Sequence, residues 1–146
     1  MSTQIIPLAF PGALLVGIAL AAVFLLIARR LRSMETAILA AGVITAALLY
    51  FSFAVMGGSN SAELRRETMG LAIFTTLAGV GVFRWRPLVG IAWLLHAGWD
   101  ILLHWPPQKW VPELYPIFCV SFDLVIAAYF LFLWAMPANA RERDGT

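Results

Sequence analysis

Charged residues are scarce in this sequence. Asp, Glu, Lys and Arg make up only 12% of the 146 residues, and the mean hydropathy is +0.86. Soluble globular domains are about 25% charged, so this chain has too few charged residues to cover a surface that faces water. The scarcity excludes a soluble globular domain and predicts that lipid surrounds most of the protein.

Cysteine and recognised motifs are also scarce. Cys119 is the single cysteine, so an intrachain disulfide and a CxxC metal or redox motif are both excluded. The sequence has no internal repeat, no low-complexity segment and no GxxxG pair. The net charge of +2 comes from arginines that are expected to set membrane topology. The lipid bilayer is therefore the expected partner, and nucleic acid is not.

Five apolar runs account for most of the chain. A helix of about 20 residues crosses the hydrocarbon core of a bilayer, and each run is close to that length. The predicted spans are residues 10–28, 36–57, 61–83, 88–105 and 116–136, and a polar cytoplasmic tail follows at 137–146. The predicted fold is all-α: a polytopic membrane protein in which residues 1–146 form a single transmembrane domain, a bundle of five transmembrane helices.

Two helix boundaries carry specific signals. Asn60 is followed three residues later by Glu63, the pattern of a capping box, which predicts that the third helix begins near Ser61. Pro106 and Pro107 are expected to end the fourth helix, because proline lacks a backbone donor and clashes with the preceding turn.

The basic residues predict the orientation of the bundle. No basic residue precedes the first apolar run and three arginines follow it, which is the reverse of a secretory signal peptide. With the N-terminus outside and the C-terminus cytoplasmic, seven of the ten basic residues lie inside, in agreement with the positive-inside rule. They are Arg29, Arg30, Arg32, Arg84, Arg86, Arg141 and Arg143. The short loops favour a bacterial cytoplasmic membrane.

Ionisable residues within the predicted spans mark candidate sites, because each costs at least about 2.5–3.5 kcal/mol on insertion scales. On the fourth helix His96, Asp100 and His104 follow one another at four-residue intervals and share one face. Asp123 on the fifth helix and Glu67 on the third lie at a similar depth. The first two helices offer only hydroxyl groups. A single polar pocket is therefore expected between the third, fourth and fifth helices, in the outer half of the bilayer.

Two interpretations of this pocket are catalytic or ligand-binding. In the first, His96, Asp100 and His104 coordinate a transition metal such as zinc, copper or iron, since imidazole and carboxylate groups are common ligands for these ions. In the second, His96, Asp100, Asp123 and Glu67 transfer protons to and from an apolar or small substrate. Aromatic and thiol side chains are expected to line the pocket, with aromatic faces available to a carbocation. They are Trp99, Trp110, Tyr115 and Cys119, and Trp93 offers a further aromatic face.

Other interpretations stay open. The row of His and Asp residues could belong to a proton- or cation-coupled permease subunit, although the inner halves of the fourth and fifth helices have few polar groups. The small chain also fits an accessory or assembly subunit of a membrane complex, or a homo-oligomer. The polar groups could instead form a purely structural network, since interhelical polar contacts commonly fasten membrane helices. The sequence does not decide whether the chain is an enzyme.

Overall fold

The computed structural model describes residues 6–136, and these residues form a bundle of five α-helices. The helices are α1 (Ile6–Arg30), α2 (Glu35–Met56), α3 (Ser61–Phe83), α4 (Pro87–Leu103) and α5 (Tyr115–Ala135), and a short 3-10 turn, η1 (Arg32–Met34), precedes α2. No strand occurs between residues 6 and 136. The predicted all-helical class is confirmed, whereas the tail predicted at 137–146 lies outside the described residues.

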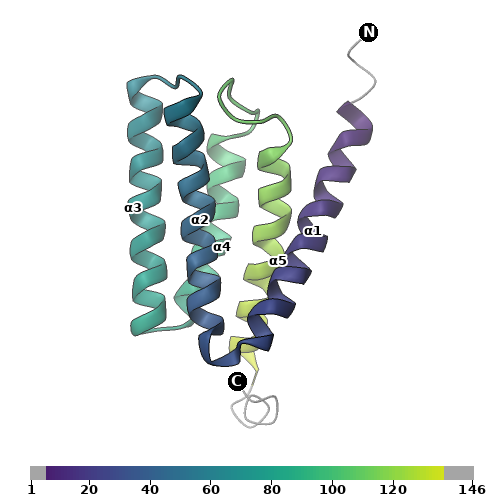
Figure 1. Ribbon diagram of the computed structural model, residues 1–146, viewed down its shortest axis with the longest axis vertical. Helices are drawn as coiled ribbons and strands as arrows, with labels where there is room; N and C mark the ends of the chain where they lie inside the picture. Colours follow the sequence, from purple (N-terminus) through teal and green to yellow (C-terminus); the bar gives the residue numbers. More distant parts are fainter. Residues whose placement is uncertain (1–5, 137–146) are drawn as a thin grey trace.

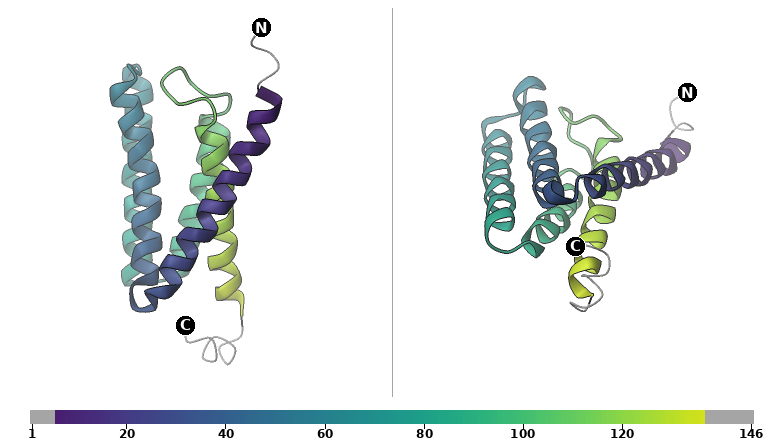
Figure 2. Two further views of the ribbon diagram at one scale, coloured as in Figure 1. Left: turned by 45° about the vertical axis from the view of Figure 1, so that its right-hand side comes forward. Right: turned by 60° about the horizontal axis from the view of Figure 1, so that its bottom comes forward.

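Successive helices run in opposite directions along the long axis of the molecule (Figure 1). The central helix α4 packs against α3 and α5, and α2 packs against α3. The first helix, α1, packs against α5 and crosses its outer side at an oblique angle, as Figure 2 shows from two further directions. As a result α2 and α5 are not close neighbours, although both contact α4.

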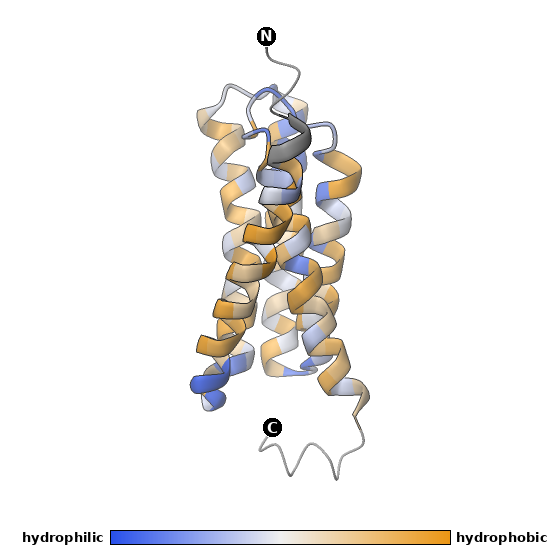
Figure 3. Cartoon of the chain, turned by 90° about the vertical axis from the view of Figure 1, so that its right-hand side faces the viewer, coloured by the Kyte–Doolittle hydropathy of each residue, from blue (hydrophilic) through white to orange (hydrophobic). Residues whose placement is uncertain are grey.

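Three of the helical segments are long and apolar enough to cross a membrane: Phe10–Arg30, Arg32–Met56 and Tyr115–Ala135. Helix α4 is apolar but has only 17 residues, and α3 carries charged residues in its first two turns. Apolar residues cover most of the helical length, and hydrophilic residues gather mainly near the helix ends (Figure 3). A membrane location fits these three helices.

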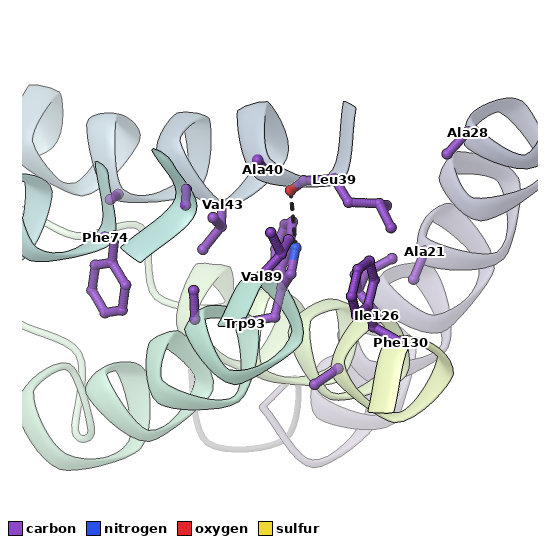
Figure 4. Close-up of a cluster of buried hydrophobic side chains, with 14 residues drawn as sticks. Ala21, Ala28, Leu39, Ala40, Val43, Phe74, Val89, Trp93, Ile126 and Phe130 are labelled. Carbon is purple, nitrogen blue, oxygen red and sulfur yellow. Dashed lines mark hydrogen bonds between the residues drawn. The ribbon is translucent and has the colours of Figure 1, made fainter. Parts of the chain in front are cut away.

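A buried apolar layer fills the bundle between its two ends. Val43, Val89 and Ile126 are fully buried there, around the indole ring of Trp93 (Figure 4). Trp93 Nε1 donates a hydrogen bond to the carbonyl oxygen of Leu39, at 3.0 Å. Trp93 thus belongs to the apolar core and does not provide the aromatic pocket wall that the sequence suggested for it.

A small polar cluster occupies the end of the bundle where α1 ends and α2 begins. The Tyr129 hydroxyl donates a hydrogen bond to the buried carboxylate of Glu35, and the guanidinium of Arg29 lies 5.7 Å from the Tyr129 ring centroid. Arg86 Nε donates to the Thr36 hydroxyl at 2.8 Å. These contacts tie α1, α2, α4 and α5 together at this end.

The start of α3 confirms the predicted capping box. The Asn60 side chain accepts hydrogen bonds from the backbone N–H groups of Ala62 (2.9 Å) and Glu63 (3.0 Å). The Glu63 carboxylate accepts in return from the Asn60 backbone N–H, at 2.8 Å. Backbone donors that the first turn of a helix cannot pair internally are thereby satisfied.

We expect Asn60→Ala to lower the free energy of unfolding by about 1 kcal/mol, the usual cost of losing an N-cap side chain. Asn60→Ser should retain most of the stability, because serine is also a good N-cap residue. Thermal unfolding of the detergent-solubilised protein, followed by tryptophan fluorescence, measures both effects. Equal stability of the alanine and serine variants would contradict the capping role.

Candidate functional site

Three buried polar side chains from α4 and α5 lie together: His96, Asp100 and Asp123. Each has at most 1% of its surface exposed. His96 Nδ1 is 2.7 Å from Asp123 Oδ2 and 3.8 Å from Asp100 Oδ2. One potential ligand atom from each residue lies within 4.8 Å of the other two, so the three side chains form a group that could hold a metal ion.

Helix geometry accounts for this arrangement. His96 and Asp100 are one turn apart and therefore share a face of α4. The chain reverses direction through residues 104–114, so that the first half of α5 packs beside the second half of α4. This reversal brings Asp123 level with His96.

His104 belongs to a second group, which lies on the α3 side of Asp100. Its Nε2 lies 3.3 Å from Glu67 Oε1, and its Nδ1 lies 3.7 Å from Asp100 Oδ1. Glu67 is buried and also accepts hydrogen bonds from Arg66 Nε at 3.2 Å and from Trp99 Nε1 at 3.4 Å. The sequence placed His104 in one ligand set with His96 and Asp100, whereas the structure places Asp123 beside those two and pairs His104 with Glu67.

The two groups form one continuous network of basic and acidic side chains, which we call the polar network. In spatial order its members are Arg66, Glu67, His104, Asp100, His96 and Asp123. Asp100 is the link, because each of its carboxylate oxygens faces a different histidine. The polar network extends from the partly exposed guanidinium of Arg66 on α3 to the buried carboxylate of Asp123 on α5.

Several polar atoms in the polar network have no hydrogen-bond partner within residues 6–136. They are both oxygens of Asp100, Oδ1 of Asp123, Nε2 of His96, Nδ1 of His104 and Nη2 of Arg66. A buried polar atom without a partner costs about 1–3 kcal/mol. These atoms are concentrated around Asp100, between the two histidines.

Helix α2 contributes Tyr50, which sequence analysis did not include in the site. Its ring stacks on the His104 imidazole, with a centroid separation of 4.0 Å and an interplanar angle of 14°. Its buried hydroxyl lies close enough to Asp100 to interact electrostatically but makes no hydrogen bond of normal geometry within the described part of the chain. The expectation that α3, α4 and α5 alone build the site was therefore incomplete.

A weak signal for Tyr50 exists in the sequence. Val43, Ala47, Tyr50 and Ala54 follow one another at intervals of three and four residues, and all four are buried. This spacing places the Tyr50 hydroxyl on the face of α2 that points into the bundle.

The predicted pocket residues surround Tyr50 and the histidines. The Tyr115 ring is 5.3 Å from the Tyr50 ring, and Trp110 meets His104 edge-on at 5.8 Å. Cys119 is buried in the same apolar cluster as Tyr50 and Trp110. Trp99 lies on the α3 side, where it bonds to Glu67. All four residues thus lie near Tyr50, His104 or Glu67, in the half of the bundle opposite the Glu35–Tyr129 cluster.

Comparisons with known proteins add family membership. Neither the comparison with curated proteins nor the comparison with solved structures gives a significant match to this chain. A protein-family model matches residues 10–136, a stretch that contains every residue of the polar site. The chain therefore belongs to the family of unknown function DUF6010.

Proposed function

We propose that this chain is a membrane-embedded metal-binding protein, with a divalent metal ion held by His96, Asp100 and Asp123. The observation that carries the proposal is the close approach of these three buried side chains, whose potential ligand atoms lie within 4.8 Å of one another. The free oxygens of Asp100 and Asp123 support it, because they supply further donor atoms at the same place.

Charge balance supports a divalent cation. An ionised carboxylate buried in an apolar medium is strongly unfavourable unless it is paired or coordinates a metal. Two carboxylates and a neutral imidazole around a divalent ion form a neutral assembly, which suits the interior of a membrane bundle. His104 and Glu67 would then orient the metal ligands without binding the ion, with His104 Nδ1 facing Asp100 Oδ1 at 3.7 Å.

The donor set favours particular metals and an open coordination sphere. One imidazole and two carboxylates suit zinc, iron(II) or manganese(II) better than copper(I), which prefers sulfur ligands. Three protein ligands leave a position for water or a substrate, as in catalytic metal sites, whereas structural zinc sites are closed by four ligands. We therefore propose an enzyme or ligand-binding protein for an apolar or small substrate.

The same proposal includes a membrane topology. We place all five helices across the bacterial cytoplasmic membrane, with the start of α1 outside and the polar site in the outer half. Arginines at the end of α1 and at the α3–α4 connection support this orientation, because both segments lie at the end of the bundle away from the site.

Metal analysis tests the site directly. Inductively coupled plasma mass spectrometry of the detergent-purified protein is expected to find about one divalent ion per chain, since the three ligands form a single site. His96→Gln, Asp100→Asn and Asp123→Asn should each lose the ion. His104→Gln should bind it about 10–100-fold more weakly, the usual effect of losing a residue that supports a ligand.

Glu35→Gln provides the matched control, because Glu35 is a buried carboxylate in the first turn of α2, whereas Tyr50 of the site lies near the other end of that helix. Its metal content should equal that of the wild type. A wild-type protein that binds no zinc, iron or manganese, either as purified without chelators or after addition of each ion, would overturn the metal proposal.

The second candidate function is acid–base chemistry without a metal. The specific observation in its favour is the 2.7 Å contact between His96 Nδ1 and Asp123 Oδ2, which leaves His96 Nε2 without a partner among the described residues. A histidine oriented by a carboxylate through one ring nitrogen can exchange a proton through the other. The metal measurement separates the two candidates, because only the first requires a bound ion.

The permease alternative receives less support. On α5, Ile126 lies between Asp123 and Tyr129. The apolar layer that it forms with Val43, Val89 and Trp93 therefore separates the polar site from the Glu35–Tyr129 cluster. A pathway for ions or protons through the bundle needs polar groups or water at this depth. The geometry therefore favours a site that opens on one side of the bundle.

A further inference from the structure

An apolar cavity of about 440 Å³ lies between α2 and α5 and reaches the polar site. We call it the α2–α5 groove. Its twelve lining residues are Phe24, Ile38, Ala41, Gly42, Thr45, Ala46, Leu49, Tyr115, Phe118, Cys119, Phe122 and Asp123. Asp123 is the charged residue among them, and it is also a member of the proposed metal site.

The arrangement of the helices explains the groove. Because α2 and α5 each pack against α4 but not closely against each other, a groove is left between them. Phe24 of α1 closes the inner end, where its ring lies 5.7 Å from that of Phe122. Along the α2 wall, Ala41, Thr45 and Leu49 are exposed on the molecular surface, so the groove opens sideways towards lipid.

The lining determines what the groove can accept. From Ile38 to Leu49 its α2 wall is about 16 Å long at the α-helical rise per residue, which suits an extended hydrocarbon chain. On the α5 wall of the groove, Asp123 Oδ1 is a hydrogen-bond acceptor without a partner within residues 6–136. A charged head group of either sign would lose its hydration in this apolar groove. A hydroxyl group avoids this cost and can donate to the free oxygen.

We propose that the α2–α5 groove binds a membrane-soluble alcohol, which enters sideways from the lipid with its hydrocarbon body along α2 and its hydroxyl group at Asp123. The inference rests on the proposed function, since it names the substrate class of the same site. A second apolar cavity, of about 280 Å³ between α1, α4 and α5, reaches Asp100 and provides the competing location. It is smaller, and its residues offer no hydroxyl or thiol group.

Photolabelling in phosphatidylcholine nanodiscs tests the groove. The probe is a long-chain alcohol with a diazirine in the middle of its chain, and labelled peptides are located by mass spectrometry. We expect saturable labelling of the groove walls, at Leu49, Phe118 and Phe122. Hexadecanol should compete at least about tenfold better than hexadecane, because only the alcohol can donate a hydrogen bond to the carboxylate.

Three variants locate the binding site. Ala46→Phe places a large ring in the groove and should abolish the saturable labelling while leaving the metal content unchanged. Ala72→Phe adds the same ring to an exposed position on α3, outside the groove, and should label like the wild type. Asp123→Leu should remove the preference for the alcohol over the alkane.

Three outcomes would overturn the inference: labelling spread evenly over the lipid-facing helices, labelling confined to the cavity at Asp100, or equal competition by alkane and alcohol. Metal analysis of the same samples separates this inference from the proposed function. A stoichiometric ion without saturable labelling refutes the groove alone. Saturable groove labelling in a protein that holds no ion refutes the metal site alone and supports the groove.

Discussion

His96→Leu is expected to lower the free energy of unfolding by about 3–5 kcal/mol, the cost of removing one partner of a buried charged pair. The imidazole lies 2.7 Å from Asp123 and 3.8 Å from Asp100, and all three side chains are almost completely buried. Without His96, the Asp123 carboxylate keeps no basic partner among the described residues, and the second carboxylate remains close to it.

A double substitution should reverse most of this loss. In His96→Leu/Asp123→Leu both polar partners are replaced by apolar residues of similar size, and such replacements of buried pairs are often neutral or stabilising. Unfolding is measured in detergent with a chelator present, so that metal binding does not contribute to the stability. The single variants and the double variant then form a thermodynamic cycle that isolates the coupling between the two side chains.

The coupling energy between His96 and Asp123 tests whether the two side chains interact as the structure places them. We expect the double variant to be more stable than His96→Leu, which a simple sum of two core substitutions would not give. If the two single losses add, or if His96→Leu costs no more than an ordinary surface substitution of about 0.5 kcal/mol, the pair does not interact as the structure places it.

The features that the sequence predicts correctly are those set by residues close together in the chain. The five apolar runs correspond to five helices, and the Asn60–Glu63 pattern marks the first turn of α3, as the hydrogen bonds confirm. The four-residue interval between His96 and Asp100 places both on one face of α4. Each of these features depends on residues a few positions apart in the chain, where helical geometry alone fixes their relation.

Features that depend on how two helices pack could not be predicted in the same way. Helical periodicity tells which residues share a face but not how far that face is rotated towards each neighbour. The pairing of His104 with Glu67, and of His96 with Asp123, depends on the rotations of α3 and α5 about α4. Tyr50 joins the site because α2 turns the same face inwards that carries its buried alanines.

The packing of α1 was missed for a different reason. The sequence has no GxxxG pair, but Gly17 and Ala21 form a pair of small residues four positions apart. Such pairs also allow close helix approach in membranes. Gly17, Ala21 and Ala28 are buried, whereas the larger neighbours Leu15 and Leu20 are 66% and 47% exposed. Helix α1 therefore meets the bundle mainly through its small residues.

We expect Gly17→Val to weaken the attachment of α1 and to lower the free energy of unfolding by at least the about 1–3 kcal/mol typical of overpacked cores. A Cβ atom at Gly17 would overlap the Ser121 side chain and would lie 2.5 Å from the Phe118 carbonyl oxygen. Because the second contact is to backbone, rotation of a side chain cannot relieve it, and α1 has to move away from α5.

Gly12→Val is the matched control on the same helix. A Cβ atom at Gly12 meets nothing within 4 Å, so the same change of residue should leave the stability close to that of the wild type. Unfolding of the two variants in detergent compares them directly. Equal stabilities would show that α1 does not cross α5 as closely as the structure places it.

The displacement of α1 should also change the α2–α5 groove, because Phe24 of α1 closes its inner end. In Gly17→Val the diazirine alcohol should therefore label residues beyond Phe122 on α5, while the ligands on α4 and α5 stay in place and the metal content is retained. Gly12→Val should give the wild-type labelling pattern. Loss of metal in Gly17→Val would contradict this separation, since it would mean that α1 is needed to hold Asp123 beside His96.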